Sequence, residues 1–71
     1  MKFSDFIQIL LDHGFELHRK GATSHAVYMR AAPGELTRIV VVAAHKMSDD
    51  IKPGTLSAMI RQSGISKKAF R

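Results

Sequence analysis

The stretch from Thr37 to Ala44 constrains the fold more than any other part of this sequence. It reads Thr-Arg-Ile-Val-Val-Val-Ala-Ala, and its β-branched residues favour a β-strand over a helix. Side chains alternate between the two faces of a strand, so this strand is apolar on both faces. We therefore expect a sheet that needs apolar cover on both sides.

Two further segments with alternating polar and apolar residues precede this strand. Residues 15–19 and 24–30 show the two-residue period of β-strands, and Pro33-Gly34 marks a β-turn before the third strand. In the second segment the alternation predicts one face with His25, Val27 and Met29 and another with Ser24, Ala26, Tyr28 and Arg30. The three segments together predict a hairpin-rich sheet.

Apolar residues at three- and four-residue spacing predict a helix on each side of the sheet segments. We expect the first helix to be capped by Ser4 and to end at Gly14. The second should begin at Pro53 and end at Gly64. We expect residues 66–71 to start one more helical turn, which is frayed.

The predicted order is α-β-β-β-α, which is an α+β fold with a three-stranded antiparallel sheet and two helices on one face. The 71 residues form one domain, residues 1–71. A domain of this size buries only about 60% of its unfolded surface, so any site is shallow. Because two short helices cover one face only, we hypothesise that a protein partner or a second copy covers the other face, or the edge of the third strand.

Composition excludes several classes of protein. The chain has no cysteine, which excludes disulfides and thiolate zinc sites, and no apolar run approaches the roughly 20 residues that span a bilayer. No signal peptide is recognisable at the N-terminus, so we expect a cytoplasmic protein. Residues 1–50 carry six basic and six acidic side chains, and residues 51–71 supply the whole net charge of +5. This balance indicates a polyanion binder or, alternatively, a domain with a merely basic surface.

The segment from Lys20 to Tyr28 is the candidate site. Gly21 begins a turn in which backbone N–H groups can approach a ligand, and His25 stands at the entrance of the second strand. Between Glu16 and Glu35 the sequence has no carboxylate. A titratable imidazole in positive surroundings suits chemistry at a phosphate, and RNA supplies its own nucleophile, the 2′-hydroxyl. Alternatively, His25 merely begins a strand.

Other catalytic chemistries find little support in the sequence. The four histidines, at positions 13, 18, 25 and 45, lack metal-ligand spacing, and we expect no metal site. No phosphate-binding loop or dinucleotide fingerprint is present. Ser24 and His25 are neighbours on opposite strand faces, which argues against a serine–histidine pair.

Several segments in order resemble the HicA family of toxins from prokaryotic toxin–antitoxin pairs, which are small messenger-RNA interferases with a fold similar to the double-stranded RNA-binding domain. The matching segments are Phe6 to Leu11 with Gly14-Phe15, Lys20 to His25, Tyr28, the β-rich run ending in His45, Lys52 to Leu56, and Arg61 to Ile65. Together they extend over nearly the whole chain.

The resemblance implies a metal-independent endoribonuclease without cofactor, in which His25 is the catalytic general acid or base. On this interpretation Arg19, Lys20 and Ser24, with the Gly21 turn, position the phosphate. Further RNA contacts would come from Lys46, Lys52 and Tyr28, the last by stacking on a base. The implied partner is a HicB-type antitoxin that covers His25 and the basic surface, and it would also account for the doubly apolar third strand.

Two other functions remain open at this point. The chain could be a non-catalytic module that binds structured RNA by shape, with salt-sensitive binding and no cleavage. It could also be a small interaction domain whose basic surface meets an acidic protein.

Overall fold

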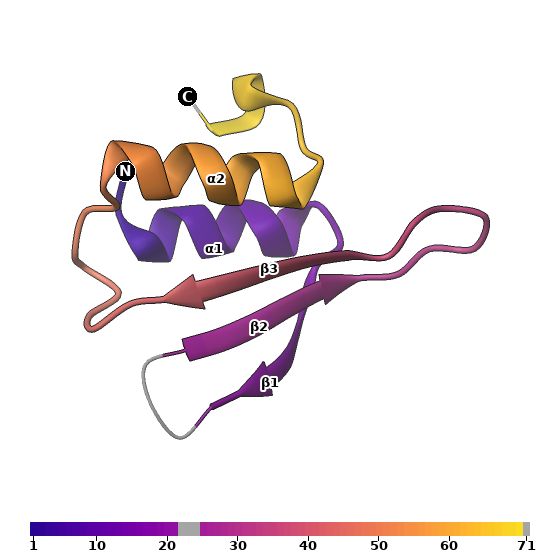
Figure 1. Ribbon diagram of the computed structural model, residues 1–71, viewed down its shortest axis with the longest axis horizontal. Coiled ribbons are helices and arrows are strands. Elements are labelled where there is room, and N and C mark those ends of the chain that lie inside the picture. Colours follow the sequence, from indigo (N-terminus) through magenta and orange to yellow (C-terminus); the bar gives the residue numbers. More distant parts are fainter. Residues whose placement is uncertain (22–24, 71) are drawn as a thin grey trace.

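The computed structural model describes residues 1–21 and 25–70 and confirms the predicted α+β order. Its elements are α1 (Phe3–Asp12), β1 (Glu16–Lys20), β2 (His25–Arg30), β3 (Arg38–Ala43), α2 (Pro53–Ser63) and a 3-10 helix, η1 (Lys67–Phe70) (Figure 1). In the described part of the chain, no helix combines the length and apolarity needed to cross a bilayer.

The three strands form one antiparallel sheet in the order β1-β2-β3. The register between β2 and β3 is uninterrupted and runs from His25 opposite Ala43 to Arg30 opposite Arg38. Between β1 and β2 the register shifts at His18, which produces a β-bulge. His25 therefore lies at the end of the sheet where β2 begins and β3 stops.

The helices cover the sheet unevenly. Both lie beside β3 in Figure 1, with β1 the most distant strand. Val40 and Val42 are buried against them, whereas Ile39 and Val41 on the opposite face are 51% and 46% exposed. Every residue of β1 is exposed. The prediction of a third strand with only one covered face is therefore confirmed.

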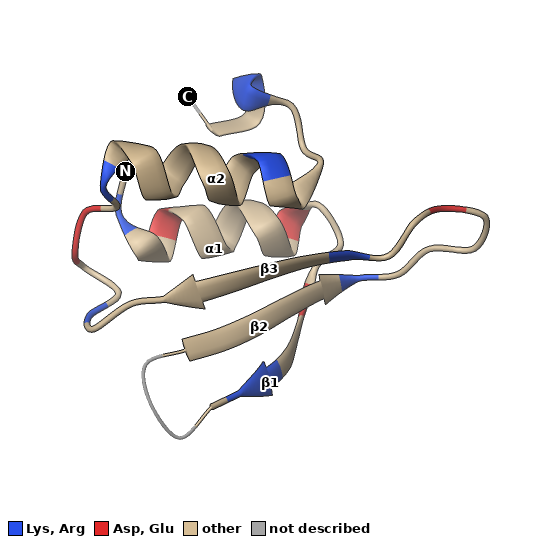
Figure 2. Ribbon diagram, viewed as in Figure 1, with Lys and Arg blue, Asp and Glu red and all other residues tan. Residues whose placement is uncertain are grey.

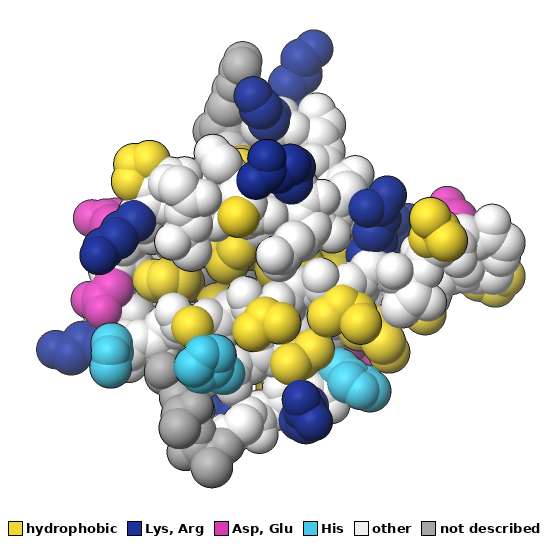
Figure 3. Space-filling view, viewed as in Figure 1, with side chains coloured by type: hydrophobic (Ala, Val, Ile, Leu, Met, Phe, Trp, Pro, Cys, Tyr) yellow, Lys and Arg dark blue, Asp and Glu magenta, His cyan; other side chains and the backbone are white. Residues whose placement is uncertain are grey.

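The uncovered side of the sheet is called the open apolar face below. Its residues alternate with the buried ones along β2 and β3, and they are Val27, Met29, Ile39, Val41 and Ala43. Figure 3 shows hydrophobic side chains gathered over these strands, bordered by histidines and a cationic side chain. Such a contiguous apolar surface on a small domain is typical of a contact site.

The helix ends are partly as predicted. Gly14 and Gly64 adopt left-handed φ angles of +90° and +69° after α1 and α2, as expected for glycine at a helix C-terminus. Ser4 is not the N-cap, because it lies within α1 and Lys2 precedes the helix. The reason is tertiary: the N–H group of Ser4 donates to the Met47 carbonyl at 2.9 Å, so a distant loop satisfies the helix end.

The C-terminal segment is better ordered than the sequence predicts. We expected a frayed turn, but Phe70 in η1 is only 7% exposed. Its ring stacks on that of Phe6 in α1, with centroids 5.0 Å apart and an interplanar angle of 21°. A buried aromatic pair thus holds η1 against α1, and the prediction of fraying is wrong.

Candidate functional site at the His25 end of the sheet

A shallow hollow of about 350 Å³ lies at the end of the sheet where β2 begins. The residues that line it come from β1, β2 and the loop after β3, and they are Leu17, Lys20, His25, Ala26, Tyr28, Ala44, His45 and Met47. Three of them, Lys20, His25 and Tyr28, are site residues predicted from the sequence. We refer to it below as the His25 hollow.

Strand pairing explains why distant segments meet at the His25 hollow. Lys20 is opposite Ala26 in the β1–β2 pair, and His25 is opposite Ala43, the last residue of β3. His45 follows two residues later in the chain. Because His25 and Ala26 belong to opposite faces of β2, a hollow lined by both straddles the end of the sheet.

The backbone of Gly21 takes part in the pairing of β1 with β2. The N–H group of Gly21 donates to the backbone carbonyl of His25 at 2.8 Å, which closes the β1–β2 pair. This N–H group is therefore used within the hairpin, and the contribution of the Gly21 turn to a phosphate site stays a prediction. Ser24, the other predicted turn residue, lies outside the described residues.

The electrostatic surroundings of the His25 hollow favour an anion. Lys20 and two imidazoles line it, and among its lining residues there is no carboxylate. Arg19 is opposite Val27 on the neighbouring open apolar face, and exposed Lys46 follows His45. Figure 2 shows the cationic residues of β1 at this end of the sheet. The acidic residues lie on α1, at the opposite end of β1, in the β2–β3 connection and in the loop before α2. A phosphate here would meet positive charge on more than one side.

Two predicted RNA contacts take different positions. Tyr28 belongs to the core and is 8% exposed, and burial raises the pKa of its phenol. So little of its ring is accessible that stacking on a base does not fit this position, and Tyr28 serves instead as a wall of the His25 hollow. Lys52 is exposed at the N-cap of α2 and is not a lining residue of the hollow.

The comparison with protein families decides the identity of the chain. Residues 3–65 match the family model described as the HicA toxin of bacterial toxin–antitoxin systems. The chain belongs to the HicA toxin family. No curated protein and no solved structure matches it. The matched region extends from the first residue of α1 to just beyond α2, and it includes both histidines of the His25 hollow.

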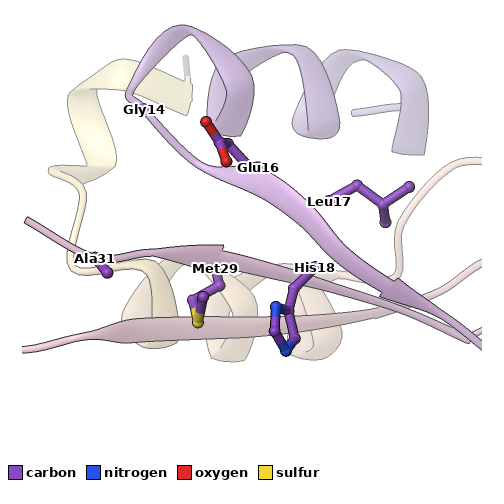
Figure 4. Close-up of a pocket in the computed structure, with 6 residues that line it drawn as sticks. All are labelled: Gly14, Glu16, Leu17, His18, Met29 and Ala31. Atoms are coloured by element: carbon purple, nitrogen blue, oxygen red, sulfur yellow. The ribbon is translucent and has the colours of Figure 1, made fainter.

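A second hollow of this HicA toxin, about 240 Å³ in volume, lies at the other end of the β1–β2 pair. Figure 4 shows the His18 ring beside the Met29 side chain, whereas the Glu16 carboxylate points away from both. The Glu16 carboxylate at the rim of this second hollow would repel a phosphate. Leu17 lines both hollows, but His25 does not line this one, because Glu16 is opposite Met29 near the far end of β2.

The remaining titratable side chains do not form a competing centre. The His13 ring lies at the end of α1, with its Nδ1 atom 2.8 Å from the Ile9 carbonyl oxygen. Across residues 1–21 and 25–70, no three or more histidine or acidic side chains group closely enough to hold a metal ion.

His45 is the functional candidate that the sequence did not single out. A signal for it existed, because a hairpin centred on Gly34 pairs residue 25 with residue 43, as the structure does. The residues just beyond position 43 must then lie near the start of β2. Metal-ligand spacing along the chain does not detect a pair of histidines that strand pairing brings together.

Proposed function

We propose that this HicA-family toxin is an endoribonuclease that cleaves messenger RNA without a metal ion, with His25 as a general acid or base. The observation that carries the proposal is the His25 hollow, where an exposed histidine shares a carboxylate-free lining with Lys20. A shallow site at the end of a sheet suits a polymer substrate, which does not need to be enclosed. RNA brings its nucleophile with it, so the protein needs only proton carriers and positive charge.

The roles of the neighbouring residues follow from their positions. Lys20 lines the His25 hollow and Arg19 lies on the adjacent face, which supports the proposal that both neutralise charge on the phosphate. Ser24, which lies outside the described residues, keeps its proposed role in binding the phosphate. Lys46 and Lys52 are exposed and would contact the RNA backbone farther along the strand.

Cleavage should persist in EDTA. Purified toxin incubated with single-stranded RNA and excess EDTA is expected to produce fragments with 2′,3′-cyclic phosphate and 5′-hydroxyl ends, because the 2′-hydroxyl is the nucleophile. At saturating RNA, adding Mg²⁺ should change the cleavage rate by less than about twofold. Saturation is needed because salt weakens the binding of RNA itself. End-specific labelling of the products measures this directly.

Two results would count against the proposal. Salt-sensitive binding of RNA without cleavage would favour the alternative, a non-catalytic RNA-binding module similar to the double-stranded RNA-binding domain. Loss of cleavage in EDTA, with recovery in Mg²⁺, would indicate a metal-dependent enzyme and remove the need for His25.

We also propose that a HicB-type antitoxin covers the open apolar face together with His25 and the basic surface. HicA toxins are components of toxin–antitoxin systems, so a protein partner is expected from the family itself. Ala43 at the end of the open apolar face is opposite His25 in the sheet. A partner that covers the exposed side chains of Ile39 and Val41 would therefore extend over the catalytic residue with little additional surface.

The variant Val41→Lys should weaken antitoxin binding while leaving RNA cleavage intact. Val41 is 46% exposed, so lysine is tolerated in the free toxin but becomes an unpaired charge under a partner. A cost of about 2 kcal/mol or more corresponds to roughly 30-fold weaker antitoxin binding. The measurement is titration calorimetry with the cognate antitoxin, alongside RNA cleavage, which should be retained.

Leu36→Lys is the matched control, because Leu36 is 81% exposed in the β2–β3 connection and outside the open apolar face. Equal antitoxin affinity of the two variants would contradict docking on this face.

A further inference from the structure

His45 lines the same hollow as His25, although His25 begins β2 and His45 lies in the loop after β3. We propose that His45 is the second proton carrier of the ribonuclease site, acting with His25 as an acid–base pair on one phosphodiester. This inference rests on the proposed ribonuclease function and adds a residue that the sequence did not assign to the site.

The hairpin register brings the two histidines together. His25 is opposite Ala43, and paired residues in an antiparallel sheet have Cα atoms about 5 Å apart. Two further residues of chain add at most about 7 Å, so the backbone of His45 stays close to the start of β2. Both side chains are exposed and both residues line one hollow of about 350 Å³. A phosphodiester bound there can contact both residues.

The loop that carries His45 is anchored on both sides. Ala44, directly before it, is 5% exposed and belongs to the core. After it, the carbonyl of Met47 accepts the Ser4 N–H at 2.9 Å, and the carbonyl of Asp49 accepts the Phe3 N–H at 3.1 Å. The N-terminus of α1 therefore holds the loop, and His45 has the fixed backbone that catalytic positioning requires.

The other histidines do not share this hollow. His13 lies at the end of α1 against the Ile9 carbonyl, and His18 lines the separate hollow near Met29. The titratable groups around the His25 hollow are Lys20 from β1, His25 and Tyr28 from β2, and His45 from the loop, with Lys46 adjacent in sequence. Of these, the two imidazoles are the groups whose ordinary pKa lies near neutrality.

A pair of imidazoles completes the proton balance of the reaction. The neutral imidazole removes the proton from the 2′-hydroxyl as the 2′-oxygen forms a bond to phosphorus. The protonated imidazole donates its proton to the 5′-oxygen as the phosphorus–5′-oxygen bond breaks. The products are a 2′,3′-cyclic phosphate and a 5′-hydroxyl, and no other reactant is required. With one histidine alone, water would have to serve at one of the two oxygens.

The first test compares His45→Ala and His45→Gln with the control His18→Ala in RNA cleavage by the full-length toxin. We expect both His45 variants to lose about 10²- to 10⁴-fold in rate and the control to remain within about twofold of wild type. The wild-type pH–rate profile should be bell-shaped, and each His45 variant should lose one limb. Circular dichroism and thermal melting check that each variant is folded.

The second test uses an RNA whose scissile 5′-oxygen is replaced by sulfur, because a thiolate leaves without protonation. Whichever histidine is the general acid, its alanine variant should recover most of the wild-type rate on this substrate, and the other variant should not. If only one of the two variants, His25→Ala or His45→Ala, recovers its cleavage rate on the sulfur-substituted RNA, the result supports an acid–base pair of histidines.

The outcomes distinguish the inference from the proposed function. If His25→Ala is inactive while folded His45→Ala keeps the wild-type rate and a bell-shaped profile, the pair is wrong and the ribonuclease function stands. If His45→Ala loses activity but retains both limbs, His45 is structural and the pair is again wrong. If the wild-type toxin does not cleave RNA, the proposed function itself fails.

Discussion

Replacing His25 with alanine is expected to lower the rate of RNA cleavage by about 10²- to 10⁴-fold, the usual contribution of one general acid or base. The fold should survive the change. His25 is exposed at the first position of β2, and its backbone carbonyl accepts the Gly21 N–H at 2.8 Å whatever side chain is present. The loss should therefore appear in kcat with little change in RNA affinity, because Lys20 and Arg19 are untouched.

The measurement for His25 has two parts, cleavage of RNA in vitro and growth arrest when the toxin is expressed. His18→Ala is the matched control, since His18 is also an exposed histidine of the sheet but lines a different hollow. Lys20→Ala provides a contrast, because loss of a phosphate contact should weaken binding and its salt dependence. Equal activity of His25→Ala and the wild type would reject the catalytic role of His25.

The sheet was predictable because its signals are local. The alternation in residues 24–30 and 37–44 predicts which side chains share a face, and the structure places Tyr28 opposite Val40 on one face of the sheet. It is the structure that identifies this face as the buried one. The turn at Pro33-Gly34 fixes the hairpin between them. These patterns involve neighbours along the chain, and the apolar surface of β3 left uncovered by two short helices follows from the same alternation.

Several differences from the sequence-based expectations concern contacts that exist only once the chain has folded. Ser4 has the right chemistry for an N-cap, but the loop carbonyl of Met47 satisfies its N–H instead. Gly21 is unhindered, yet its N–H is used within the hairpin. His45 joins the His25 hollow only through strand pairing. Ser4 and His45 meet partners far along the chain, which the sequence around each residue does not report. The Gly21 contact is short in sequence, but it depends on how the hairpin closes.

The largest expected effect on stability comes from the same kind of distant contact. Phe70→Ala should lower the free energy of unfolding by about 3–5 kcal/mol, the usual range for a buried phenylalanine. Phe70 is 7% exposed and stacks on Phe6, which is fully buried. A domain of 71 residues has a total stability of roughly 4–11 kcal/mol, so this one change removes a large share of it.

Urea unfolding followed by circular dichroism measures the effect of Phe70→Ala. With a denaturant slope of about 1 kcal/mol per molar, the urea midpoint should fall by about 3–5 M, or the variant should be unfolded without urea. Leu36→Ala is the control, since Leu36 is 81% exposed and its loss should stay within about 0.5 kcal/mol. Phe70→Leu should give an intermediate value, because it keeps apolar volume but loses the ring stack. If Phe70→Ala matched the control, η1 would not be docked on α1, and the frayed end expected from the sequence would describe the protein in solution.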